Sequence, residues 1–260
     1  MGTEFNKYEG TGNDFIIIDN RNLNFIADKD LISAMCHRRF GIGADGLILI
    51  EPEPGVDFRM RYFNADGGEG SMCGNGGRCA AHFAFSNSIA KPEMEFIAFD
   101  GLHHAVVKGE TVTITLADVN QIEQDGNICF LNTGSPHYVE FFEDLNSIDV
   151  VRRGREIRYS PRFAPQGTNV NFVKTDGSRI IVRTYERGVE DETLSCGTGV
   201  TASAIAAVIT GHFDSTPVNV ETLGGRLIVN FQAHEGSASG VILTGPATFV
   251  YSGIYEPKTK

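Results

Sequence analysis

Apolar residues along this chain gather in short runs separated by glycine-rich and polar turns, and this pattern predicts a protein built mainly of strands. β-Branched and aromatic residues dominate these runs, as they do in strands. In the first half, we expect strands at 15–19, 46–50, 57–63, 94–98, 105–108 and 111–116. In the second half, we expect strands at 138–142, 170–174, 180–185, 218–222, 226–231, 240–243 and 247–251.

Four segments carry helix signals instead. Asp28 or Asp30 can cap a helix that runs to residue 38, and a basic helix follows Ser147. An alanine-rich helix begins at Gly74, and a fourth helix covers 198–210. The fourth segment, TGVTASAIAAVIT, is apolar on nearly every side but too short to cross a bilayer. We therefore expect it to be enclosed by sheet.

The two halves of the chain repeat one another. Four landmarks recur in the same order at offsets of 122 to 124 residues, which indicates a duplicated unit. These pairs are GTGNDF at 10 with GSPHYV at 134, GAD at 43 with GTN at 167, RYFN at 61 with RTYE at 183, and Cys73 with Cys196. We predict an N-terminal half at 1–118 and a C-terminal half at 119–248, joined by a polar linker near 117–126.

Composition narrows the class of protein. The chain has 260 residues, 41% of them hydrophobic, and a formal charge of −11. This charge argues against nucleic acid or an anionic membrane as a partner, and the basic run at 152–155 is better explained as a solvated helix face. The start MGTEFNKYEG does not resemble a signal peptide, and no apolar run approaches the length of a membrane span. Five cysteines without a CxxC pair favour neither a disulfide framework nor a zinc site, so we expect a cytoplasmic protein without a metal.

The candidate chemistry lies in two similar turns, SMCGNGGRC around Cys73 and LSCGTGV around Cys196. A cysteine just before a helix lies near unsatisfied N–H groups and the positive end of the helix dipole, which lower its thiol pKa. The glycines that follow let the backbone approach an anion closely. Each half thus supplies one possible base and part of a carboxylate site.

If the halves face each other across a cleft, two sulfurs flank one substrate. A thiolate can then remove a proton from a carbon while the opposite thiol returns one to the other face. This is the requirement for racemising or epimerising a centre next to a carboxylate, and the helix dipoles stabilise the developing charge.

Simpler interpretations account for the other candidates. Cys36, Cys79 and Cys129 are expected to be small core residues. The GxGxxA pattern at 197–202 lacks the strand directly before it that a dinucleotide site needs, because the acidic loop GVEDETLS intervenes. No ligand cluster surrounds the histidine pair at 103–104, and a Cys-His hydrolase would leave the second cysteine turn unexplained.

Taken together, the motifs resemble the diaminopimelate epimerase family, whose enzymes act without pyridoxal phosphate or another cofactor in lysine and peptidoglycan-precursor synthesis. The resemblance spans nearly the whole chain and is carried by GTGNDF, FNADG, MCGNGGRC, SPH, GTNVNFV, YERG and CGTG, at 10–15, 63–67, 72–79, 135–137, 167–173, 185–188 and 196–199. Proline racemases share single pieces, whereas CGNG followed by arginine and YERG before the second turn favour the epimerases.

The resemblance implies a role for each matching residue. Cys73 and Cys196 would be the acid/base pair, and His137 and Glu186 would tune their pKa values. The substrate, diaminopimelate, would contact backbone N–H groups of Gly74, Asn75, Gly197 and Thr198, and the side chains of Asn13, Asn64, Asn169, Glu186 and Arg187. An arginine suits the distal carboxylate and a glutamate suits the distal ammonium.

The resemblance also implies an α/β fold of two pseudo-symmetric halves, each a mainly antiparallel, barrel-like sheet wrapped around a central helix. The last strand, within 249–260, would complete the first half, and the protein would be a homodimer. Three features depart from the family pattern: Gly46 and Ser135 stand where other members have glutamine and asparagine, and ERGVEDETLSCG carries an extra acidic residue. Two alternative functions stay open, another amino-acid racemase of the same fold and a non-catalytic anion- or nucleotide-binding module.

Overall fold

The computed structural model describes residues 2–257, so Met1 and the 258–260 end of the predicted last strand lie outside the described residues. The described chain forms two compact units. The first unit comprises residues 2–114 together with 246–257, and the second unit comprises Thr115–Gly245.

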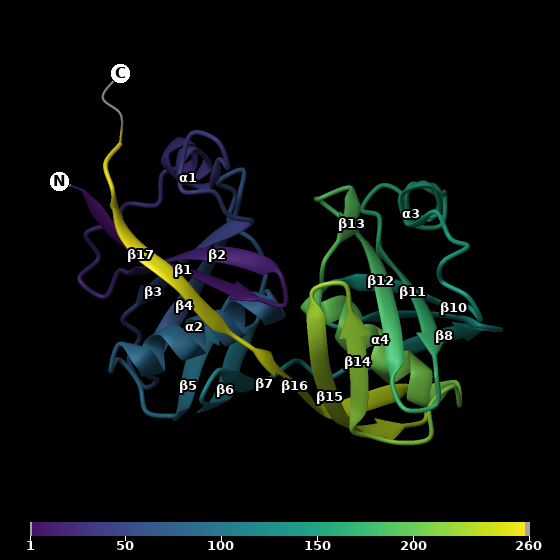
Figure 1. The fold of residues 1–260 in the computed structure, drawn as a ribbon. Helices are drawn as coiled ribbons and strands as arrows, with labels where there is room; N and C mark the ends of the chain where they lie inside the picture. Colours follow the sequence, from purple (N-terminus) through teal and green to yellow (C-terminus); the bar gives the residue numbers. More distant parts are fainter. Residues whose placement is uncertain (1, 258–260) are drawn as a thin grey trace. The chain divides into compact units, whose positions relative to one another are not determined.

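The first unit wraps strands around one helix, α2 (Figure 1). Its elements are β1 Thr3–Gly10, β2 Asn13–Asp19, α1 Lys29–Cys36, β3 Gly46–Glu51, β4 Phe58–Asn64, α2 Gly74–Ser86, β5 Glu93–Ala98, β6 Gly101–Lys108, β7 Thr111–Thr115 and β17 Thr248–Tyr255. Strand β1 pairs antiparallel with both β2 and β17, so the C-terminal strand is part of this unit. Helix α2 contacts β1, β2, β3, β4, β6 and β17.

The second unit repeats this plan around helix α4. Its elements are β8 Ile122–Asp125, β9 Ile128–Asn132, β10 Pro136–Phe141, α3 Val150–Arg158, β11 Asn169–Thr175, β12 Ile180–Glu186, β13 Asp191–Thr193, α4 Gly197–Ile209, β14 Val218–Thr222, β15 Gly225–His234 and β16 Ser237–Pro246. The series β10-β11-β12-β14 pairs parallel, antiparallel and parallel, which is also the order in β2-β3-β4-β5. The predicted fold class, two repeated α/β halves each built around a helix, is confirmed.

Small side chains let the strands approach the central helices closely. Ala80, Ala81 and Ala84 of α2 are buried, and α4 is buried from Gly199 to Ala207. A helix with apolar residues on all sides is stable in water only when other elements cover it. The prediction that 198–210 is an enclosed helix is therefore confirmed, with the first turn starting one residue earlier, at Gly197.

The structure corrects three predictions of local structure. Helix α1 is capped by Asp28 but ends at Cys36, because Ile42 and Gly43 donate backbone N–H groups to Met35 O and turn the chain. The expected linker at 117–126 contains β8, which pairs with β9. The acidic loop before Cys196 contains β13, which pairs with the end of β12. Strands β1 and β9 were not predicted. Charged and polar residues interrupt the apolar positions of β1, whereas β9 begins with a short apolar run directly after the predicted linker.

No helix within residues 2–257 is long and apolar enough to span a bilayer.

Candidate active site

In the first unit, Cys73 is the N-cap residue of α2. Its backbone is extended (φ −109°, ψ 117°), and its side chain makes no capping hydrogen bond. The sulfur is half-buried beside the first turn of the helix, where the N–H groups of Gly74 and Asn75 belong to the orphan donors of a helix start. The predicted position of this cysteine, directly before a helix, is confirmed.

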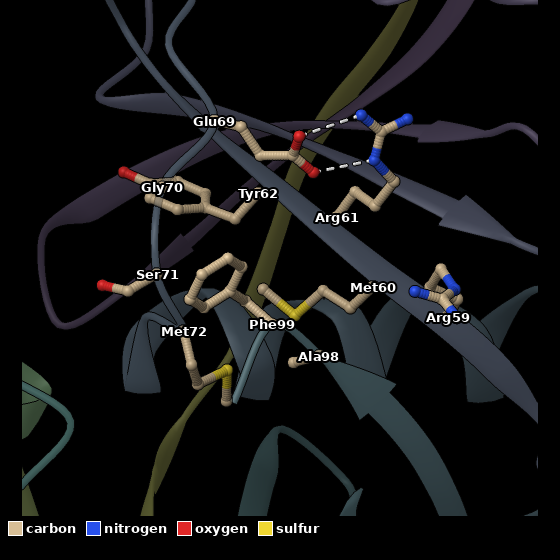
Figure 2. A pocket seen from close by; sticks show the side chains of 10 residues that line it. All are labelled: Arg59, Met60, Arg61, Tyr62, Glu69, Gly70, Ser71, Met72, Ala98 and Phe99. Atoms are coloured by element: carbon tan, nitrogen blue, oxygen red, sulfur yellow. Dashed lines mark hydrogen bonds and ion pairs between the residues drawn. The ribbon is translucent and has the colours of Figure 1, made fainter. Parts of the chain in front are cut away.

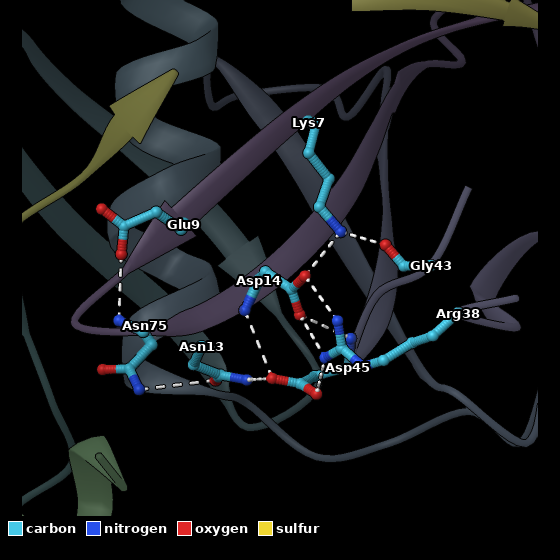
Figure 3. A network of polar contacts seen from close by, with 9 residues as sticks. Lys7, Glu9, Asn13, Asp14, Arg38, Gly43, Asp45 and Asn75 are labelled. Carbon is cyan, nitrogen blue, oxygen red and sulfur yellow. Dashed lines mark hydrogen bonds and ion pairs between the residues drawn. The ribbon is translucent and has the colours of Figure 1, made fainter. Parts of the chain in front are cut away.

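Two side-chain amides, Asn13 and Asn75, are linked to one another (Figure 3), and Asn13 also contacts Cys73. The thiol donates to Asn13 Oδ1 at 3.6 Å, and Asn75 Nδ2 donates to the same oxygen at 3.4 Å. Asn13 Nδ2 in turn donates to Asp45 Oδ2 at 2.7 Å. Because Asp45 Oδ2 accepts this hydrogen bond, the Asn13 NH₂ group faces Asp45 and the Asn13 oxygen faces Cys73.

A buried arginine holds the other end of this network. Arg78 is 0% exposed, and its guanidinium donates to Asn75 Oδ1 at 3.0 Å, to Gly74 O at 3.2 Å and to Pro246 O at 3.2 Å. Burial lowers the pKa of this guanidinium, and the nearby Cys79 and Cys73 act in the opposite direction. Sequence reasoning gave Arg78 no role of its own. The available signal was a single charged residue inside a helix of small and apolar side chains.

An ion cluster supports Asp45 from the solvent side. Asp14 pairs with Lys7 and Arg38 at 2.7 Å each, and Arg38 also contacts Asp45 (Figure 3). Burial would raise the pKa of Asp14, but hydrogen bonds and charge from Arg38 and Lys7 outweigh it and lower this pKa to about 2. The Asp14 carboxylate is therefore ionised at neutral pH, and Asp45 accepts hydrogen bonds from Arg38 and Asn13.

In the second unit, Cys196 is the N-cap residue of α4, with φ −117° and ψ 112°. Its sulfur is buried and lies 3.5 Å from Thr198 Oγ1. Gly197 and Thr198 start the helix, as Gly74 and Asn75 do in the first unit. The predicted helix-start position is confirmed here as well.

Hydrogen bonds link the half-buried Thr198 to the buried His137. His137 Nε2 lies 2.9 Å from Thr198 Oγ1 and 3.0 Å from Ser135 Oγ, while Asn171 Nδ2 donates to His137 Nδ1 at 3.1 Å. The orientation of Asn171 follows from its oxygen, which accepts the Thr184 hydroxyl at 3.0 Å.

This network fixes the protonation of the histidine. Burial, with a smaller contribution from Arg187, lowers the pKa of His137 to about 3, so the imidazole is neutral at pH 7. Since Nδ1 accepts from Asn171, the hydrogen is on Nε2 and is donated toward Thr198 and Ser135. The Thr198 hydroxyl is then able to donate its own hydrogen to the Cys196 sulfur.

The remaining predicted residues lie at strand ends. Asn169 begins β11, donates to Ser135 Oγ at 3.2 Å, and accepts the Arg187 backbone N–H at 2.8 Å. Glu186 ends β12, directly before Arg187. Asn64 ends β4 and donates to Gly68 O at 3.5 Å within its own turn. The structure thus joins Asn13, Asn75 and Cys73 in one network and His137, Thr198, Cys196, Asn169 and Arg187 in another.

A cavity of about 160 Å³ lies beside the segment that leads into Cys73 (Figure 2). Arg61 and Glu69 form an ion pair at its wall, with 2.8 Å between Nε and Oε1. Tyr62 also lines it, and a Cβ added at Gly46 would lie 2.4 Å from the Tyr62 ring. The tyrosine ring therefore occupies the space that a side chain at position 46 would need.

The other three cysteines are buried, as predicted, and no cysteine forms a disulfide. Burial raises the thiol pKa of Cys36 to about 12 and that of Cys129 to about 11, and it raises that of Cys79 as well. These thiols stay protonated at neutral pH. Within residues 2–257, no group of three or more histidine, cysteine, aspartate and glutamate side chains is placed to hold a metal ion.

Comparison with solved structures shows which fold the chain shares. It is similar to a Bacillus anthracis phenazine biosynthesis protein of the PhzF family, with a TM-score of 0.78 at 14% identity, covering 99% of this chain and 100% of that one. It is also similar to a probable proline racemase from Agrobacterium radiobacter, with a TM-score of 0.71 at 15% identity, covering 96% and 92%. At these identities the likeness concerns the fold alone.

Sequence comparison shows the family. The family model for diaminopimelate epimerase matches twice, over residues 5–126 and 129–250. The diaminopimelate epimerase of Flavobacterium psychrophilum is 48% identical over 248 residues, covering 94% of this chain and 97% of the relative. That of Chlorobaculum tepidum is 44% identical over 254 residues, covering 94% and 98%. With a full-length match of this identity and a cysteine at the start of each central helix, the chain belongs to the diaminopimelate epimerase family.

Proposed function

We propose that the protein interconverts LL- and meso-2,6-diaminopimelate by two-base catalysis, with Cys73 and Cys196 as the acid/base groups. One sulfur, as thiolate, removes the α-hydrogen, and the other, as thiol, delivers a hydrogen to the opposite face of the same carbon. The observation that carries this proposal is the repeated placement of a cysteine at the N-cap of a buried helix in a member of the epimerase family.

The helix starts supply what a carbanion next to a carboxylate needs. Gly74 and Asn75 begin α2, and Gly197 and Thr198 begin α4, so their N–H groups point out of the first turn of each helix. We assign the substrate α-carboxylate to these groups. Negative charge that develops as the α-hydrogen leaves is stabilised by N–H dipoles that are already oriented, so little reorganisation is needed.

The distal end of the substrate carries a second ammonium and a second carboxylate. Arg187 suits the carboxylate because its guanidinium offers a fork of donors, and Glu186 suits the ammonium. Asn169 holds the Arg187 backbone through its side-chain oxygen, which supports a precise position for this pair. We place Asn13, Asn64 and Asn169 among the further polar contacts to the substrate.

An isotope experiment tests this function. When reduced protein acts on LL-diaminopimelate in deuterated water, meso product should carry deuterium at one α-carbon from the first turnover. Substrate recovered early should carry none, because in a two-base reaction the proton is returned from the opposite side by a different group. Equal early labelling of substrate and product would argue for a single base, and no exchange at all would contradict the function.

We further propose a cytoplasmic location and a homodimer. The cytoplasm keeps thiols reduced, as two-base catalysis by cysteines requires, and diaminopimelate epimerisation serves lysine and peptidoglycan-precursor synthesis. Cell fractionation and light scattering on the purified protein test these two points.

A further inference from the structure

The two cysteines meet hydrogen-bond partners of opposite polarity. Cys73 is the donor in its contact with Asn13 Oδ1, an amide oxygen with no hydrogen to give. Cys196 faces Thr198 Oγ1, a hydroxyl that can give one. A partner that accepts stabilises a thiol, whereas a partner that donates stabilises a thiolate.

We propose that Cys73 is the protonated thiol and Cys196 the thiolate in the resting enzyme, and that Asp45 is the positioning residue that sets this state by orienting the Asn13 amide. This inference rests on the proposed function, since it assigns the two starting roles within the same pair of acid/base groups.

The orientation of Asn13 is fixed from both sides. Its NH₂ group lies 2.7 Å from Asp45 Oδ2, so rotating the amide by 180° would place two oxygens against one another. Its oxygen also accepts from Asn75 Nδ2, and Arg78 fixes that second amide by donating to its oxygen. A reversed Asn13 would therefore lose both contacts, and the oxygen stays directed at the Cys73 sulfur.

The Thr198 hydroxyl has two side chains beside it that are able to donate hydrogen bonds, His137 and Ser135. It accepts from His137 Nε2–H at 2.9 Å, and Ser135 Oγ lies 3.3 Å away. Asn169 Nδ2 donates to that serine oxygen, which leaves the serine hydrogen free to point at Thr198. The hydrogen of Thr198 is then available for the Cys196 sulfur, and no charged group is needed to stabilise the thiolate.

Some charged groups near Cys73 favour its thiol form, and others favour its thiolate form. The carboxylates of Asp45 and Asp14 favour the thiol, and Glu9 also lies near the Arg78 guanidinium. Arg78 itself favours a thiolate, while the cations Lys7 and Arg38 are paired with Asp14. Cys79 is neutral at neutral pH. Charges of both signs therefore lie in this cluster, and we assign the state of Cys73 to its directional bond with Asn13.

The test is the pH dependence of alkylation at each sulfur, measured by iodoacetamide labelling and mass spectrometry on the substrate-free, full-length protein. Accessibility scales a whole rate curve, whereas its midpoint reports the thiol pKa. We expect a lower midpoint for Cys196 than for Cys73. An equal midpoint, or a lower one for Cys73, would overturn the assignment.

Two substitutions of Asp45 distinguish its effect on the orientation of the Asn13 amide from the effect of its charge. The side chain is 42% exposed, so neither variant should prevent folding. Asp45→Ala releases the Asn13 amide and should raise the Cys73 alkylation rate at pH 7 by about tenfold, the effect of one pKa unit. Asp45→Asn removes the charge but can keep its oxygen toward Asn13 Nδ2 and Asp14 N–H, while its NH₂ group replaces the oxygen that accepts from Arg38. This variant should change the rate by less than about threefold.

Equal effects of the two variants, or no effect of Asp45→Ala, would overturn the positioning role. The measurement uses no substrate, so it is independent of the epimerase assay. If the substrate exchanges deuterium but the alkylation midpoints do not differ as predicted, only this inference is refuted. If the midpoints differ as predicted but no deuterium is exchanged, only the proposed function is refuted.

Discussion

The start of α2 and the start of α4 place a cysteine at the same point of the same element but surround it with different chemistry. Asn13 and His137 occupy corresponding positions in the repeat, 124 residues apart. Around Cys73 stand two amides, a carboxylate and a buried guanidinium, and around Cys196 stand a hydroxyl and a neutral imidazole. The two units thus share the same helix start, but they differ in the side chains that set the direction of the hydrogen bond at each sulfur.

This difference is useful in an epimerase. Two bases on one carbon need opposite protonation states before each turnover, and identical surroundings would give both sulfurs the same thiol pKa. Because the neighbouring residues differ between the two units, the two thiol pKa values can differ although each cysteine lies at the same end of a helix dipole.

The largest effect on kcat is expected when either of the two cysteine sulfurs is removed. Cys73→Ala and Cys196→Ala should each lower kcat by about a thousandfold, because each variant lacks one of the two proton-transfer groups. Chiral chromatography of the diaminopimelate isomers measures this. Cys129→Ala serves as the matched control and should keep near wild-type activity, since this thiol is buried elsewhere in the second unit. Full activity in either of the first two variants would refute the two-base mechanism.

The next test replaces His137 in the second unit with asparagine, the residue found at the corresponding position, Asn13, of the first unit. His137→Asn should lower kcat by about tenfold to a hundredfold, because Thr198 loses the donor that directs its hydroxyl at Cys196. The alkylation midpoint of Cys196 should rise with it. His234→Asn, at an exposed histidine, is the control. A fall in kcat with no shift of that midpoint would indicate a purely structural role.

His137→Asn also tests how the buried, neutral imidazole of His137 contributes to the pH dependence of stability. The pKa of His137 is lowered to about 3, from near 6.5 in an unfolded chain. Its contribution to stability is therefore present above pH 6.5 and is lost as pH falls toward 3, because the unfolded state binds the proton first. Urea unfolding at several pH values should show a shallower loss over this window in His137→Asn than in the wild-type protein.

A third test compares the two helix starts through glycines at corresponding positions. A Cβ at Gly199 would lie 2.4 Å from Asn171 Oδ1, an atom already held by Thr184. A Cβ at Gly76 would meet the side-chain ends of Ile48 and Met60 at 3.2 and 3.3 Å, and Cys73 Cβ at the ordinary contact distance of 3.5 Å. Gly199→Ala should lower the free energy of unfolding by about 2 kcal/mol. Gly76→Ala should change it by less than about 1 kcal/mol, because alanine favours the helix. Equal losses measured in urea would contradict the proposed difference in crowding.

The smallest expected effect concerns the ion cluster of the first unit. Asp14→Asn should lower the free energy of unfolding by about 1 to 2 kcal/mol at pH 7, because the pKa of Asp14 lies near 2 rather than near 4. This stability is present above pH 4 and is lost as pH falls toward 2. The difference between variant and wild type should therefore shrink over that range, and a constant difference would point to packing instead.

The cysteine turns show how far the sequence alone could go. Cys73 and Cys196 were predicted to precede helices from the glycine pattern and the repeat, and both are N-cap residues. Strand β1 escaped prediction because Lys7 and Glu9 interrupt its apolar residues, although Lys7 is buried through its pairing with Asp14. Tertiary pairing of this kind overrides local polarity, so it cannot be inferred from the pattern of a single segment.

The amino-acid sequence by itself determined the duplication, the enclosed helices and the family, because periodicity, glycine placement and motif spacing are local properties. Only the tertiary structure decided the direction of the hydrogen bonds at each sulfur. Asn13 lies in β2, Asp45 precedes β3 and Arg78 lies within α2, and their mutual orientation exists only once these elements pack. The polarity of a hydrogen bond depends on which lone pair a neighbour from another element presents, and no spacing along the chain encodes it.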